Sequence, residues 1–120
     1  MNEDYEKLKS NLISIASELF RFQRVFTKAI SKLDMEEQSK YSSQYAWFSK
    51  KVAKALDGAG LRVVSVDGQQ YDPGMAITPL NLDDFETDDI LYVEHTMEPI
   101  IMEGDAVIKT GTALLRRKDR

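Results

Sequence analysis

The feature that most constrains this chain is an uninterrupted heptad pattern of apolar residues near its start. Apolar side chains recur at alternating spacings of three and four, at Tyr5, Leu8, Leu12, Ile15, Leu19, Phe22, Phe26, Ala29 and Leu33. This spacing is typical of the seam of a coiled coil or of a bundle helix. Because no proline or glycine occurs in residues 1–57, the pattern predicts one helix from about Asp4 to Leu33. At 1.5 Å per residue such a helix is roughly 45 Å long.

A second apolar row, formed by Ile13, Ala16 and Phe20, lies beside the heptad seam. The two rows together make an apolar stripe wider than a two-stranded coiled coil covers. A chain of 120 residues has too little else to bury so long a stripe. We therefore expect this helix to pack against more than one neighbour.

A second helix is predicted to follow a tight turn at Asp34. Asp34 and Glu37 have the spacing of a capping box, in which Asp34 accepts a hydrogen bond from an early backbone N–H group. Apolar side chains then recur at helical spacing, with Trp47 beside them, at Tyr41, Tyr45, Phe48, Val52 and Leu56. Gly58 and Gly60 are predicted to end the helix, since glycine adopts the left-handed conformation without a steric penalty.

The two predicted helices form a hairpin, and two hairpins in a four-helix bundle hide both apolar stripes. We therefore interpret residues 1–59 as the helical dimerisation region of a homodimer. The residues expected in the dimer interface are Leu12, Ile15, Leu19, Phe22, Phe26, Phe48 and Val52.

The apolar period changes after Gly60, and residues 60–120 are predicted to form a small β domain. Leu61–Val66 is rich in β-branched residues, and Asp67-Gly68 is a hairpin-turn signal. In Tyr71-Asp72-Pro73-Gly74 we expect a turn that Asp72 caps, Pro73 fixes in φ and Gly74 completes with positive φ. Further extended segments are Met75–Leu82 with Pro79 at an edge or bulge, Ile90–Thr96, Ile100–Met102, Ala106–Lys109 and Thr112–Leu115. The fold class is therefore α+β, with a dimeric helical bundle followed by a compact β-sandwich or small barrel.

Composition and charge argue against several classes of function. The formal net charge is −4 and basic residues cluster only at Arg116–Arg120, so nucleic-acid binding is not expected. The chain has no cysteine, which removes thiolate nucleophiles and thiolate metal sites and fits a reducing compartment. The acidic start is unlike a signal peptide, and no stretch has the roughly 20 apolar residues that span a bilayer. We expect a cytoplasmic protein that binds no membrane.

No catalytic constellation is visible in the sequence. His95 is the single histidine, and no nucleophile pattern accompanies it. The carboxylates of Asp83–Asp89 lack the glycine and ligand positions of a calcium loop. No glycine-rich loop stands between a strand and a helix to hold a phosphate. We therefore predict a binding protein rather than an enzyme, without cofactor or metal.

Several local motifs, in this order of elements, resemble the GrpE family, the nucleotide exchange factors of DnaK-type chaperones. The helix end at Val52–Leu61 is similar to the family's leucine-rich helix, which ends in a glycine and an apolar residue. Tyr71-Asp72-Pro73 is similar to the family's aromatic-Asp-Pro triplet. The resemblance extends over about residues 15–117 and is completed by Val64, Gly68, the strand Ile90-Leu91-Tyr92-Val93 and the apolar-apolar-basic segment Val107-Ile108-Lys109.

This resemblance implies a co-chaperone whose β domain binds a DnaK-type ATPase, or a diverged relative, and promotes release of ADP. The residues that it assigns to chaperone binding are Asp72, Pro73, Ile108, Lys109 and Thr110. The chain differs from the family pattern at Ala76, Ala106 and Thr110, so a relative that binds without exchanging nucleotide stays open. The alternative from another class is a scaffold module, a coiled-coil dimer that displays a β domain to an unrelated protein.

Overall fold

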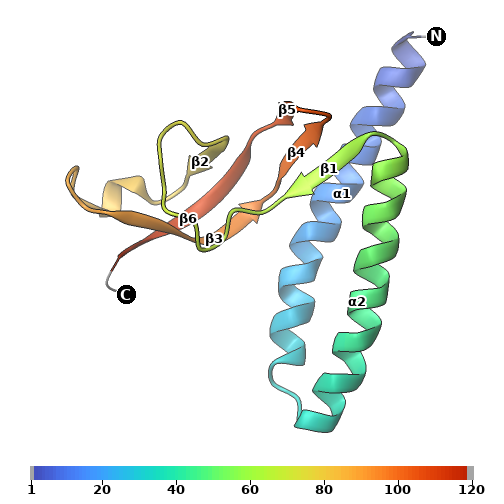
Figure 1. Ribbon diagram of the computed structural model, residues 1–120, viewed down its shortest axis with the longest axis horizontal. Coiled ribbons are helices and arrows are strands. Elements are labelled where there is room, and N and C mark those ends of the chain that lie inside the picture. Colours follow the sequence, from blue (N-terminus) through green and yellow to red (C-terminus); the bar gives the residue numbers. More distant parts are fainter. Residues whose placement is uncertain (1, 119–120) are drawn as a thin grey trace. The chain divides into compact units, whose positions relative to one another are not determined.

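The computed structural model describes residues 2–118. The chain divides into two compact units, Met1–Leu61 and Arg62–Arg120. In the described part of the chain, the first unit holds two helices and the second holds two small sheets (Figure 1). The predicted α+β class is confirmed.

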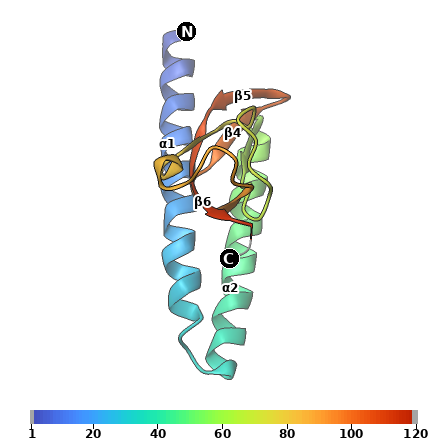
Figure 2. The same ribbon diagram turned by 90° about the vertical axis from the view of Figure 1, so that its left-hand side faces the viewer.

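The helical unit is an antiparallel hairpin of α1 (Asn2–Ile30) and α2 (Met35–Gly58) (Figure 2). Asp34 accepts a 2.9 Å hydrogen bond from the backbone N–H of Glu37, so the predicted N-cap of α2 is confirmed. The Gln38 side chain donates to the backbone oxygens of Ser31 and Leu33, at 3.1 and 2.9 Å. These bonds satisfy carbonyl groups that the end of α1 leaves without a partner, and they close the turn.

The end of α2 agrees with the glycine stop that the sequence predicts. Gly60 has a φ of 78°, a left-handed conformation that glycine adopts without strain. The backbone N–H groups of Ala59 and Gly60 donate to the carbonyls of Leu56 and Asp57, each at 2.9 Å. The glycine stop predicted for this helix is therefore confirmed, and the chain leaves α2 directly into the first strand.

The strands form two three-stranded sheets, with the orders β1-β4-β5 and β2-β6-β3. Their bounds are β1 Leu61–Val64, β2 Ile77–Pro79, β3 Leu91–Glu98, β4 Ile100–Glu103, β5 Ala106–Lys109 and β6 Gly111–Arg117, with a 3₁₀ turn η1 at Leu82–Asp84. The edge position predicted for Pro79 is confirmed, because β2 is an outer strand and ends at this residue. The Asn81 side chain extends the pairing of β2, since it accepts from the Leu115 N–H at 2.9 Å and donates to the Leu115 carbonyl at 3.0 Å.

Four of the strands belong to one long, bent hairpin that joins the two sheets (Figure 1). β3 pairs antiparallel with β6, and β4 pairs antiparallel with β5. Only Pro99 separates β3 from β4, and only Thr110 separates β5 from β6. The turn at the tip contains Gly104, whose φ of 60° favours glycine. Each arm therefore passes from one sheet to the other at a single residue, Pro99 in the first arm and Thr110 in the second.

The hairpin predicted at Asp67-Gly68 is wrong, because β1 and β2 are not neighbours in either sheet. The Asp67 carboxylate instead accepts a hydrogen bond from the backbone N–H of Thr96, in the middle of β3. Thr96 is fully buried, and its hydroxyl oxygen accepts from the Val66 N–H at 3.1 Å. A turn sequence specifies its own backbone but not the strand that it contacts, and here the contact lies about 30 residues further along the chain.

The core of the β unit lies between the hairpin arms, β2 and the end of the β1 segment. Its buried members are Val66, Ile77, Leu91, Val93, Ile100, Ala113 and Leu115. Tyr71, Met75 and Phe85 from the connecting loops pack against them. These loop side chains enlarge the core of the β unit.

Gly111 lies in close contact with the backbone of the opposite arm of the hairpin. A Cβ atom built on Gly111 lies 2.5 Å from the carbonyl oxygen of Glu98 and 3.1 Å from the backbone nitrogen of Ile100. Both neighbours are backbone atoms, so neither can move aside as a flexible side chain does. The Gly111 N–H also donates to the Ala76 carbonyl at 3.0 Å, where the parallel pairing of β2 with β6 begins.

We predict that Gly111→Ala lowers the free energy of unfolding by about 1–3 kcal/mol, the usual cost of forcing an extra carbon into a packed site. Gly74→Ala is the matched control, because a Cβ at Gly74 meets its nearest atom at an ordinary 3.5 Å. Urea unfolding followed by near-ultraviolet circular dichroism measures both variants. Equal free energies of unfolding for the two variants would show that the close approach at Gly111 does not contribute to stability.

Candidate protein-binding surfaces

The heptad seam of α1 is divided by the hairpin into a half-buried row and an exposed row. Leu12, Leu19 and Phe26 are half-buried. Leu8, Ile15 and Phe22, which recur every seven residues, expose 71, 57 and 57% of their surface. At 1.5 Å per residue the exposed row extends for about 21 Å along α1. A contiguous row of large exposed apolar side chains is a candidate interaction surface.

On α2, aromatic residues both close the hairpin and reach the solvent. Tyr45 lies against Phe26 of α1, with ring centroids 6.0 Å apart. Val52 is half-buried, but Phe48 is exposed. Phe48 lines a shallow open hollow with Ser43, Gln44 and Trp47. Of the residues predicted for the dimer interface, Ile15, Phe22 and Phe48 are therefore the exposed ones.

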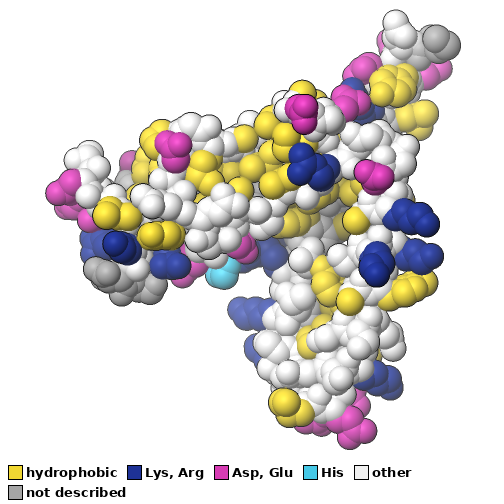
Figure 3. Space-filling view, in the orientation of Figure 1, with side chains coloured by type: hydrophobic (Ala, Val, Ile, Leu, Met, Phe, Trp, Pro, Cys, Tyr) yellow, Lys and Arg dark blue, Asp and Glu magenta, His cyan; other side chains and the backbone are white. Residues whose placement is uncertain are grey.

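In the β unit, the apolar segment Ala106–Lys109 is the outer strand β5 of its sheet. Val107 exposes 46% of its surface and Ile108 exposes 36%, although adjacent strand residues point to opposite faces. Lys109 is half-buried at the end of the strand, and Thr110 is exposed beyond it. Figure 3 shows apolar side chains (yellow) at the surface around the β4–β5 end of this unit. Three of the predicted chaperone-binding residues thus lie together on or beside one exposed strand.

The other two predicted binding residues, Asp72 and Pro73, form an exposed turn. The Asp72 carbonyl accepts from the Met75 N–H at 2.9 Å, and its carboxylate accepts from the Gly74 N–H at 3.2 Å. The positive φ predicted for Gly74 is wrong, because the glycines with positive φ are Gly60, Gly68 and Gly104. A turn with proline at its second position forms equally well with both central residues at negative φ. Both Asp72 interactions therefore hold the turn itself.

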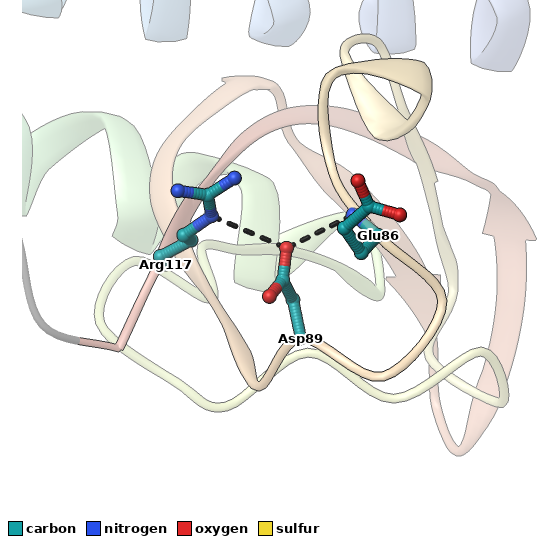
Figure 4. Close-up of polar contacts among 3 residues, drawn as sticks. All are labelled: Glu86, Asp89 and Arg117. Carbon is teal, nitrogen blue, oxygen red and sulfur yellow. Dashed lines mark hydrogen bonds and ion pairs between the residues drawn. The ribbon is translucent and has the colours of Figure 1, made fainter.

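The acidic connection contains a structural carboxylate rather than a ligand cluster. Asp89 accepts from the Glu86 N–H at 2.9 Å and from Arg117 Nε at 3.2 Å (Figure 4). Asp89 thereby ties the connection to the end of β6. Within residues 2–118, no group of three or more His, Asp or Glu side chains is placed to hold a metal ion. His95 is exposed on β3, beside a register shift in the β3–β6 pairing.

No family model, curated protein or solved structure matches this chain. Neither α1 nor α2, as far as residues 2–118 are described, is long and apolar enough to cross a membrane.

Two features of these surfaces were missed by the sequence analysis. Leu8 belongs to the exposed row of α1 but was not assigned to the interface, although its seven-residue spacing from Ile15 was visible. Val107 is the most exposed large apolar residue of β5. No sequence signal separates an exposed apolar strand such as Ala106–Lys109 from a buried one, because both are short apolar runs.

We predict that Asp72→Ala lowers the free energy of unfolding by about 0.5–1.5 kcal/mol, the net contribution of one intramolecular hydrogen bond. Asp72→Asn keeps an oxygen that can accept from the Gly74 N–H, so it should retain most of the stability. Thermal unfolding of the chain without any partner measures both variants. An Asp72→Ala chain as stable as the wild type would contradict the turn-forming role of this carboxylate.

Proposed function

We propose that this chain is a GrpE-like co-chaperone, a cytoplasmic homodimer that binds a DnaK-type ATPase through its β unit and promotes release of ADP. The observation that carries the proposal is the combination of a helical hairpin with an uncovered apolar row and a small β unit with an uncovered strand. The residues that resemble the GrpE family lie on these elements, including the glycine stop of α2, the Asp72-Pro73 turn and strand β5.

The proposed mechanism is a shift of population rather than a chemical reaction. A protein that binds the open form of an ATPase cleft more tightly than the closed form shifts the ATPase toward the open form. Bound co-chaperone then lowers the affinity of the ATPase for nucleotide by some factor. Thermodynamic linkage requires bound nucleotide to lower the affinity of the ATPase for the co-chaperone by the same factor. Such a role needs a rigid surface and no catalytic group, and β5 with Lys109 is the surface that we assign to it.

The homodimer is supported by the surface of α1. Leu8, Ile15 and Phe22 lie on one line and are more than half exposed. Fully burying a side chain of this size contributes about 1.5–3 kcal/mol, so covering the row is strongly favourable. A second hairpin carries the same row, and a four-helix bundle covers both copies at once.

We predict that Ile15→Lys with Phe22→Lys converts the dimer into a monomer, because two lysines on each copy cannot be buried in an apolar interface without a large cost. Both side chains are exposed in the hairpin, so the helices should stay folded. Ser14→Lys with Arg21→Lys is the control, since these exposed positions have the same spacing on α1 but lie off the row. Sedimentation velocity at micromolar concentration measures the mass, and a wild-type monomer would disprove the dimer.

We predict that the wild-type chain accelerates nucleotide release from its ATPase and that Lys109→Glu reduces this acceleration at least about tenfold, the factor that 1.4 kcal/mol represents. A lysine that pairs with an acidic partner surface loses this attraction and gains repulsion when its charge is reversed. Lys118→Glu is the control, because Lys118 is an exposed cation of the same unit outside β5.

The measurement is stopped-flow release of a fluorescent nucleotide from the DnaK-type ATPase encoded nearest this gene. A wild-type chain that binds this ATPase without accelerating release would favour a relative that lacks exchange activity. If the wild-type chain neither binds this ATPase nor accelerates nucleotide release, the co-chaperone proposal is wrong. The alternative, a scaffold module for another protein, then takes its place.

A further inference from the structure

Aspartate is followed directly by glycine at two places in the chain, Asp57-Gly58 and Asp67-Gly68. In such a pair the glycine amide nitrogen can attack the carboxyl group of the aspartate, because glycine has no Cβ atom in the way. The attack closes a five-membered imide ring, and hydrolysis of this ring can produce isoaspartate. The reacting groups are the same in both pairs, so the folded structure around each pair decides which of them reacts.

At Asp67-Gly68 both reacting groups are held by strand β3. The Gly68 N–H donates to the Val93 carbonyl at 2.8 Å. The Asp67 carboxylate accepts from the backbone N–H of Thr96, a fully buried residue. Ring closure at this pair must break both hydrogen bonds to a strand that is itself paired with the central strand β6. Opening such a region costs a large share of the free energy of unfolding, so the fold protects Asp67.

At Asp57-Gly58 the reacting groups lie in the last turn of α2. Residues 57–60 are all exposed, and within residues 2–118 the Asp57 carboxylate makes no hydrogen bond or ion pair. Gly58 is the last residue of α2, and in an α-helix its N–H donates to the carbonyl four residues earlier. Attack on Asp57 therefore requires the last helical turn to open. Helix ends fray, and such local opening costs little free energy.

We propose that Asp57 is a site of spontaneous isomerisation to isoaspartate and that Asp67 is protected from the same reaction. The Gly58 nitrogen bonds to Cγ of Asp57, and the amide proton and the carboxyl hydroxyl leave together as water. Water then adds to one of the two ring carbonyls. Addition at the former backbone carbonyl breaks its bond to nitrogen and leaves Gly58 attached through Cγ, which is isoaspartate. One water is released and one is consumed, so the reaction needs no oxidant or other reagent.

Isomerisation changes the backbone where α2 ends. The chain then runs through Cβ and Cγ of Asp57, so one carbon atom is added to the backbone before Gly58. The Gly60 N–H donates to the Asp57 carbonyl at 2.9 Å, and in the product this carbonyl has become a carboxylate outside the backbone. Isoaspartate therefore disrupts the hydrogen bonding that ends α2 just before β1. The proposal does not depend on the co-chaperone function.

Ageing of the full chain in warm, mildly acidic buffer tests the proposal, because acid keeps more of the carboxyl groups protonated and ready to lose their hydroxyl as water. Trypsin cleaves after Arg62, which lies between the two pairs, so each pair is analysed in its own peptide. An isoaspartate peptide keeps its mass but changes its retention time, and fragmentation by electron transfer locates the altered residue. In the folded chain Asp57 should isomerise at least about tenfold faster than Asp67, the factor that a difference of 1.4 kcal/mol in opening free energy represents.

The same chain in concentrated urea is the matched control. Unfolding removes the hydrogen bonds to β3, so both pairs should isomerise at rates within about twofold of each other. In the folded chain, equal rates at the two aspartates or a faster rate at Asp67 would overturn the proposal. Absence of isomerisation at Asp57 over a time in which the unfolded chain reacts would overturn it as well.

Gly58→Ala supplies an independent readout. A Cβ atom built on Gly58 meets no atom within 4 Å, so the substitution leaves the packing unchanged. Alanine at this position strengthens the last helical turn and places a Cβ atom beside the attacking nitrogen, so isomerisation of Asp57 in the folded chain should slow at least about fivefold. If the rate does not change, opening of the turn and attack by this nitrogen do not control the reaction, and the proposal is wrong.

Discussion

The β unit depends on the contact between Gly111 and the backbone around Pro99, where both arms of the long hairpin change sheets. The carbonyl oxygen of Glu98 lies where any larger residue would place a Cβ atom. The N–H of Gly111 bonds Ala76, which fixes the start of the β2–β6 pairing. One glycine thus lets the two arms approach, sets the register of a parallel strand and allows the remaining halves of the arms to pair as β4 and β5.

The helical half was predictable because its rules are local. An aspartate three residues before a glutamate, and a glycine after the last apolar residue, specify helix ends through the backbone groups that they satisfy or allow. The division of the α1 seam was less predictable. The heptad pattern identifies Leu12, Ile15, Leu19 and Phe22 as one stripe, but only the position of α2 decides which row is covered. Phe26 is held against Tyr45, whereas Phe22, four residues earlier, is exposed.

In the β half, the sequence located most strands but not their partners. Asp67-Gly68 carries a turn signal, yet its carboxylate bonds Thr96 rather than closing a hairpin with β2. Gly74 illustrates a similar limit, since Pro73 is compatible with more than one turn type. For the candidate site, the segment Val107–Lys109 was recognised by its residue types, but its exposure was not. Exposure follows from the sheet order, and that order is set by contacts between residues distant in sequence.

The position of β6 has a consequence for how the β unit folds. β6 is the central strand of its sheet, although it follows both β2 and β3 along the chain. β3 reaches β6 through the hairpin, whereas β2 must close a loop that contains β3, β4 and β5 before Ile77 meets Gly111. Closing a longer loop costs more entropy before any contact forms. We therefore expect the hairpin to form first and β1 and β2 to add to it afterwards, so that the residues that come first in this unit become ordered last.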